Sequence, residues 1–204
     1  MSVGVERSED EHKAKMARIK AAKDRIYAGK TVEKGLLIVH TGTGKGKSTA
    51  AWGMVMRCLG HGLGVGVVQF VKGRRETGER AFLKRFPELV KVAVMGEGFT
   101  WETQDRARDV AAAKAALEAA AGMLADPDLH LVVLDELNIV LRYGTLPVEE
   151  VLQVLQARRP GLHVVVTGRN AQPALVEAAD LVTEMRLVKH PFREGVKGQL
   201  GVEF

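Results

Sequence analysis

The stretch Gly35 to Thr49 reads GLLIVHTGTGKGKST and is the strongest indication of the fold of this chain. An apolar run typical of a buried strand, Leu36 to Val39, gives way to alternating glycines, Lys47-Ser48 and a helix-forming sequence. A strand, a glycine-rich loop, Lys-Ser and a helix form the architecture of a phosphate-binding P-loop. Small residues let backbone N–H groups turn toward one anion, and the helix adds free N–H groups and the positive end of its dipole. The stretch therefore predicts a nucleotide-binding domain.

The loop departs from the common P-loop pattern G-x-x-x-x-G-K-[ST], because Thr41 stands where the first glycine is expected. A glycine-rich turn without a ligand is the alternative, but Gly-Lys-Ser at the start of a helix rarely follows a strand by accident. We expect Lys47 to neutralise phosphate charge and the Ser48 hydroxyl to ligate Mg²⁺. The predicted nucleotide contacts of the loop are Gly42, Thr43, Gly44, Lys45, Gly46, Lys47, Ser48 and Thr49.

Composition indicates one globular domain with an appended arm. The chain has 204 residues, 46% of them hydrophobic and 27% charged, which is ordinary for a globular protein with a sizeable core. A formal net charge of +5 suits an anionic ligand such as a nucleotide, and it does not require nucleic acid. The single cysteine, Cys58, excludes an internal disulfide, and no long apolar stretch occurs. We therefore expect a cytoplasmic protein without a membrane partner.

Strand-like and helix-like segments alternate along the chain. This alternation predicts an α/β fold with a mainly parallel six-stranded sheet and helices on both faces. The expected strands are Leu36–Val39, Val65–Val71, Val90–Met95, Leu131–Leu134, His163–Thr167 and Leu181–Val188. The expected helices are Glu9–Ala28, Ala50–Leu59, Glu79–Phe86, Gln104–Leu124, Pro147–Arg158 and Pro173–Ala179.

Residues 1–34 differ from the rest of the chain in being polar and basic. Met16, Ile19 and Ile26 recur at helical spacing within this segment, so we expect a helix with a narrow apolar stripe. We predict an N-terminal helical arm or lid at 1–34 and a P-loop α/β catalytic domain at 35–204. The arm either docks on the domain or closes over a ligand or a second subunit.

Polar residues follow several of the predicted strands at their carboxyl ends, where open α/β sheets bind ligands. The run LVVLDE resembles a Walker B element, in which Asp135 or Glu136 would hold Mg²⁺. The sequence leaves open which of the two carboxylates is the inner ligand. Arg169, after the fifth strand, is a candidate for the triphosphate or the base. Arg57 lies too far along its helix for the same phosphate and is a candidate contact for the nucleoside end.

The loop Gly96 to Glu102 carries Phe99 and Trp101 at the same edge of the sheet. Two large aromatic side chains in a glycine-rich loop either fold under it into the core or form the apolar floor of a flat ligand. The residues leave both interpretations open.

Taken together, the motifs resemble the bacterial corrinoid adenosyltransferases that carry a P-loop, acting on cob(I)alamin or cob(I)yrinic acid a,c-diamide. The resemblance extends from about Gly35 to the C-terminus, whereas the N-terminal segment matches only in character. Thr43, Ser48 and Trp52 depart from the residues that many members carry there. The matching stretches are GTGKGKST, RCLGHG, VGVVQFVKG, GFTWETQ, LVVLDEL, TGRNA and VKHPFREGVKGQLGVEF.

The resemblance implies a RecA-like sheet and a specific reaction. ATP would bind with Mg²⁺, a corrinoid reduced to Co(I) would attack the ribose C5′ carbon, and triphosphate would leave intact. Lys47, Phe99 and Trp101 would carry catalysis, with the two aromatic residues under the corrin in place of its lower axial ligand. The resemblance also implies that the irregular glycine spacing is related to a reaction at the α-phosphate end of ATP.

The same resemblance implies a homodimer and an electron donor such as a reduced flavoprotein. The competing interpretation is a RecA-like ATPase or nucleotide-binding module acting on nucleic acid. Against it, no stretch combines aromatic and basic residues in the manner of a strand-binding surface.

Overall fold

A computed structural model of the chain describes residues 9–71, 77–94 and 105–203. The chain divides into two compact units, Met1–Glu33 and Lys34–Phe204. The first contains helix α1 (Glu9–Ala28), which buries none of its residues within this unit. In the described part of the chain, no helix combines the length and apolar content needed to cross a membrane.

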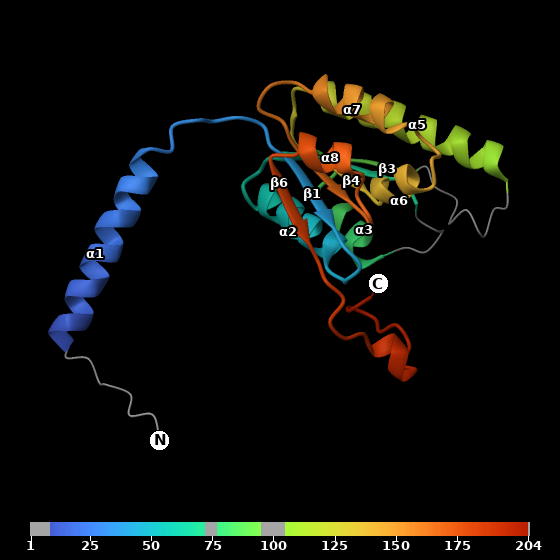
Figure 1. The fold of residues 1–204 in the computed structure, drawn as a ribbon. Helices are drawn as coiled ribbons and strands as arrows, with labels where there is room; N and C mark the ends of the chain where they lie inside the picture. Colours follow the sequence, from blue (N-terminus) through green and yellow to red (C-terminus); the bar gives the residue numbers. More distant parts are fainter. Residues whose placement is uncertain (1–8, 72–76, 95–104, 204) are drawn as a thin grey trace. The chain divides into compact units, whose positions relative to one another are not determined.

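The second unit is built on a six-stranded parallel sheet (Figure 1). Its strands lie in the order β3-β2-β4-β5-β1-β6, so β5 separates the P-loop strand β1 from the acidic strand β4. This arrangement confirms the predicted RecA-like α/β fold. The strands are β1 (Leu37–Thr41), β2 (Gly64–Gln69), β3 (Val90–Val94), β4 (Leu129–Asp135), β5 (His163–Thr167) and β6 (Leu181–Glu184).

Helices cover both faces of the sheet because its central strands are apolar on both sides. Alternate residues of one strand enter different cores: Leu37 and Val39 of β1 join one cluster, and Ile38 joins the other. Figure 1 shows α5 and α7 on one side of the sheet and α2 and α3 on the other. In the described residues, the helices of this unit are α2 (Lys47–Gly60), α3 (Gly78–Leu83), α5 (Arg106–Ala125), α6 (Leu137–Arg142), α7 (Val148–Gln156) and α8 (Pro173–Ala178), with a 3₁₀ turn η1 (Pro191–Glu194).

Among the elements whose bounds differ from the sequence-based expectation, three bear on the site. Helix α2 begins at Lys47 instead of Ala50, because Gly46 takes a left-handed conformation (φ 109°) that ends the loop. Helix α6 was not expected, since its sequence LNIVLR is too short to show a helical period. Strand β6 ends at Glu184, and the chain continues from there over the P-loop.

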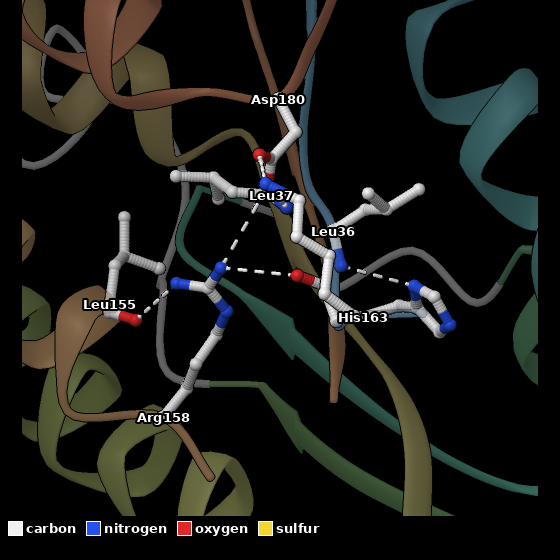
Figure 2. Close-up of polar contacts among 8 residues, drawn as sticks. Leu36, Leu37, Leu155, Arg158, His163 and Asp180 are labelled. Carbon is white, nitrogen blue, oxygen red and sulfur yellow. Dashed lines mark hydrogen bonds and ion pairs between the residues drawn. The ribbon is translucent and has the colours of Figure 1, made fainter. Parts of the chain in front are cut away.

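The amino end of β1 is fixed by side chains from three later segments (Figure 2). The Leu37 N–H donates to Asp180 Oδ2 at 2.9 Å, and the Leu36 N–H donates to His163 Nδ1 at 3.2 Å. Arg158 donates to the Gly35 carbonyl oxygen at 3.4 Å and lies 3.9 Å from the Asp180 carboxylate. These contacts anchor the start of the P-loop strand far from the phosphate edge.

The bond to His163 makes this anchor sensitive to acid. Burial, and the neighbouring ring of His130 at 5.0 Å, lower the pKa of His163 below its ordinary value of 6.5. The unfolded chain therefore binds the proton more readily than the folded one. The stability that neutral His163 contributes is complete above about pH 6.5 and is lost as the pH falls through the lowered pKa.

Replacing His163 with asparagine should reduce this acid sensitivity, because its amide oxygen takes the position of Nδ1 and still accepts a hydrogen bond but does not titrate. Urea unfolding at about pH 7.5 and pH 5 measures the loss of unfolding free energy on acidification. We expect a smaller loss in His163→Asn than in the wild type. Equal losses in the two proteins would contradict this role of His163.

Candidate nucleotide site

The glycine loop lies between the end of β1 and the start of α2, as a P-loop requires. Its backbone is covered by the segment that follows β6: the Gly44 N–H donates to the Met185 carbonyl oxygen at 2.6 Å, and the Met185 N–H donates to the Thr41 carbonyl oxygen at 2.8 Å. A Cβ atom on Gly44 would lie 2.5 Å from the carbonyl oxygen of Arg186. The glycine spacing thus has a local structural cause, the close approach of a second backbone.

Substituting Gly44 with alanine should therefore destabilise the fold. The new methyl group would meet backbone atoms of Met185 and Arg186, which cannot move aside as a flexible side chain can. We expect a cost of about 1–3 kcal/mol in the free energy of unfolding. Gly53→Ala is the matched control, because Gly53 lies within α2 with no atom within 4 Å of its added Cβ. The control should be stabilised by roughly 0.5–1 kcal/mol, and a similar loss in both variants, measured by urea unfolding, would refute the explanation.

Lys47 is held inside the loop and not in solvent. Its side chain is 7% exposed, and Nζ donates to the Gly44 carbonyl oxygen at 2.6 Å. Burial lowers the pKa of Lys47, and the positive charges of Arg169 and Lys45 act in the same direction, whereas Glu136 opposes them. The site thus concentrates positive charge that a polyanion would stabilise.

Asp135, the last residue of β4, accepts hydrogen bonds from three other elements. Its Oδ1 atom accepts from the Ser48 hydroxyl and from the Thr167 hydroxyl, each at 2.8 Å. Its Oδ2 atom accepts from the Gln69 amide at 3.3 Å. Asp135 is 2% exposed, and these bonds together fix the orientation of its carboxylate beside the Ser48 hydroxyl.

Glu136 differs from Asp135 in position and backbone conformation. It has a left-handed backbone (φ 61°) and caps α6, and its N–H donates to the Thr167 hydroxyl at 3.0 Å. Its side chain approaches Gly168, where an added Cβ would lie 3.2 Å from Glu136 Oε2. The two adjacent acidic residues thus have different surroundings, and only Asp135 hydrogen-bonds the Ser48 hydroxyl among the contacts described.

These groups line a common cavity of about 510 Å³. Most of the predicted site residues line it, from both the loop and the carboxyl ends of the strands. They are Gly44, Lys45, Gly46, Lys47, Ser48, Thr49, Asp135, Glu136 and Arg169.

Some predicted residues are not brought to this cavity. Gly42 and Thr43 do not line it, and Gly42 instead faces the backbone of Met185. Arg57 is exposed in the last turn of α2 and does not line this cavity, so its contact with the nucleoside end stays a prediction. Phe99 and Trp101 lie outside the described residues.

The C-terminal segment contributes lining residues that sequence reasoning missed. His190, Val202 and Glu203 line the cavity, and the Glu203 carboxylate pairs with the Lys45 ammonium. No local sequence pattern predicts such a long-range contact. The motif that resembles the family, VKHPFREGVKGQLGVEF, covers these positions and was the only available signal. Trp52, Thr77 and Glu79 are further lining residues.

Comparison with known proteins gives a consistent result over nearly the whole chain. A family model described as "ATP:corrinoid adenosyltransferase BtuR/CobO/CobP" matches residues 33–204. A Pseudomonas aeruginosa protein named corrinoid adenosyltransferase is 61% identical over 193 residues, which is 95% of each chain. A Sinorhizobium protein of the same name is 54% identical, covering 98% of this chain and 94% of its own. The Salmonella typhimurium corrinoid adenosyltransferase CobA is 45% identical, covering 97% and 100%.

Proposed function

Because the chain belongs to the ATP:corrinoid adenosyltransferase family, we propose that it transfers the 5′-deoxyadenosyl group of ATP to the cobalt of a corrinoid. The observation that carries the proposal is the meeting of the glycine loop, Lys47 and Asp135 in one cavity within the matched residues. The Co(I) electron pair forms the cobalt–carbon bond. The C5′–oxygen bond breaks, and triphosphate leaves with that bond's electron pair.

The loop and its cations stabilise the leaving triphosphate. Negative charge builds on the α-phosphate oxygen as the C5′ bond breaks, and buried positive groups act most strongly at such a position. Lys47 is the buried cation at this cavity, and the exposed Arg169 adds positive charge to its lining, whereas Lys45 is paired with Glu203 and contributes less. Because cobalt is itself the nucleophile, the protein needs no side-chain base, and positioning of the two substrates dominates catalysis.

The residues at the cavity fit Mg²⁺. Ser48 Oγ and Asp135 Oδ1 are hard oxygen donors 2.8 Å apart at the edge of the nucleotide cavity. Magnesium is typically held by one or two carboxylates together with substrate phosphates. Within the described residues no cluster of three or more His, Cys, Asp or Glu would hold a metal without such help. We infer that Asp135 is the inner carboxylate; the bound ion would neutralise phosphate charge.

The aromatic pair Phe99 and Trp101 is proposed to form the apolar floor under the corrin. The support is the match of GFTWETQ to the family motif. Excluding the lower axial ligand lowers the energy of the cobalt orbital that receives an electron, which eases reduction of Co(II). We further propose that an electron donor such as a reduced flavoprotein supplies the electron. We also propose that the protein is a homodimer and that the arm at 1–34 acts as a lid.

Replacing both Phe99 and Trp101 with alanine should separate corrinoid activation from nucleotide binding. We expect ATP affinity within about twofold of the wild type, because the aromatic pair does not belong to the phosphate cradle. The electron paramagnetic resonance signal of four-coordinate Co(II), recorded with ATP present, should disappear. If that signal is unchanged in the double variant, the floor is assigned to the wrong residues.

The products formed from ATP test the proposed function. Phosphorus NMR of a reaction with Mg²⁺, ATP and chemically reduced cobalamin should show triphosphate accumulating in step with the adenosylated corrinoid. ADP or pyrophosphate as the main product would overturn the proposal. Phosphate release stimulated by nucleic acid would instead favour a RecA-like ATPase.

A further inference from the structure

Gln69 occupies the last position of β2, directly beside Asp135. The two residues are register partners in the parallel pairing of β2 with β4, so their side chains leave the sheet at the same level. Gln69 is 1% exposed, which is unusual for a long polar side chain. Such a burial needs a reason beyond packing, because a buried amide costs free energy unless it is hydrogen-bonded.

The orientation of the Gln69 amide follows from the chemistry of its partner. An ionised carboxylate only accepts hydrogen bonds, so the nitrogen of the amide must face Asp135. Nε2 lies 3.3 Å from Asp135 Oδ2, on the opposite carboxylate oxygen from Ser48 and Thr167. Gln69 and Thr167 thus hold the carboxylate from the two strands that flank β4. The carboxylate cannot rotate without breaking one of these bonds.

The other end of the amide has no hydrogen-bond partner among the described residues. Gln69 Oε1 is buried and accepts no bond there. An unpaired buried acceptor destabilises the folded state, and natural sites retain such a group when a bound group supplies the donor. Water molecules on a metal ion are strong donors, and Mg²⁺ usually keeps several of them.

We propose that Gln69 is a positioning residue for the magnesium site: its amide nitrogen orients Asp135, and its amide oxygen accepts a hydrogen bond from the hydrated cation. This inference rests on the proposed metal role of Asp135 and extends it to a residue outside the P-loop and the Asp135-Glu136 pair. Residues that orient a metal ligand typically change metal affinity 10–100-fold when they are replaced. Gln69 acts on the metal through Asp135 and through water bound to the ion, and it does not line the cavity that would hold the nucleotide.

The test measures ATP binding by titration calorimetry without corrinoid, so that turnover plays no part. The variants are Gln69→Leu and Gln69→Met, which keep the size of the side chain and remove both polar atoms. We expect the Mg²⁺ concentration that gives half of the magnesium-dependent gain in ATP affinity to rise by about tenfold or more in both. ATP affinity in the presence of a chelator should stay within about twofold of the wild type.

Val68→Ala is the matched control for a general loss of stability. Val68 is the neighbouring residue of β2 and is fully buried in the core that faces α5. Its truncation should lower the melting temperature and leave the Mg²⁺ half-saturation unchanged. A Gln69 variant with the wild-type half-saturation, or with equal losses of ATP affinity with and without Mg²⁺, would overturn the inference. If the ATP affinity of the wild-type protein does not depend on Mg²⁺, the proposed metal site itself is wrong.

Discussion

Replacing Lys47 with alanine should lower kcat for adenosyl transfer by about 100- to 1,000-fold, because a buried cation that meets developing charge is lost. Lys47 is 7% exposed and its ammonium donates to the Gly44 carbonyl oxygen within the loop, so water screens its interaction with phosphate only weakly. Steady-state kinetics at saturating ATP and reduced cobalamin measure the effect. A loss of less than about tenfold, equivalent to ~1.4 kcal/mol, would contradict a role in stabilising the leaving group.

Lys45→Ala provides the charge-matched control for this prediction. It removes the same positive charge two positions away, but the Lys45 side chain is 48% exposed and paired with Glu203. Exposed ion pairs contribute little, typically about 0–1 kcal/mol. We therefore expect a change of only a few-fold in kcat. If both variants lose activity equally, then net charge near the cavity, and not the buried position of Lys47, explains the effect.

The second large effect is expected from Asp135→Asn. Asparagine has the shape of aspartate, and its amide oxygen can still accept from Ser48 and Thr167 at the present Oδ1 position. Gln69 can turn its amide over to accept from the new NH₂ group, so the fold should be retained. Without the charge, however, Mg²⁺ loses its protein carboxylate. We expect kcat to fall by at least about 100-fold and the Mg²⁺ requirement to rise.

Glu136→Gln distinguishes the two adjacent carboxylates. Glu136 lies beside Gly168 and acts on Lys47 through its charge, whereas the hydroxyl of Ser48 donates to Asp135. A Mg²⁺ titration of activity should therefore shift much further in Asp135→Asn than in Glu136→Gln. The opposite order of effects would make Glu136 the inner ligand and refute our assignment.

The sequence predicted the parts of the site that depend on local patterns. Apolar runs, glycines and periodicity were enough to predict the P-loop strand and the acidic end of β4. They also predicted the bounds of two elements, which the structure has as α1 at Glu9–Ala28 and β5 at His163–Thr167. Parallel strands bring their carboxyl ends to one edge, so the meeting of Ser48 with Asp135 could be anticipated from the order of elements alone.

Long-range contacts account for what the sequence could not supply. The passage of Met185 and Arg186 over the glycine loop, and the pairing of Glu203 with Lys45, join residues more than a hundred positions apart. The glycine alternation was therefore interpreted through its ligand, although Gly44 is also required by a neighbouring backbone. Helix α6 was missed because the turn at Glu136 needs a left-handed backbone that the sequence does not signal in a non-glycine residue.

The fate of the ribose C5′ carbon distinguishes adenosyl transfer from hydrolysis of ATP. Purified protein is incubated in the dark with Mg²⁺, chemically reduced cobalamin and ATP labelled with carbon-13 at C5′. We predict a light-sensitive product in which the labelled carbon is bonded to cobalt, formed in equal amount to free triphosphate. If ATP is consumed but the label is recovered in ADP and no cobalt–carbon bond forms, the protein does not transfer the adenosyl group.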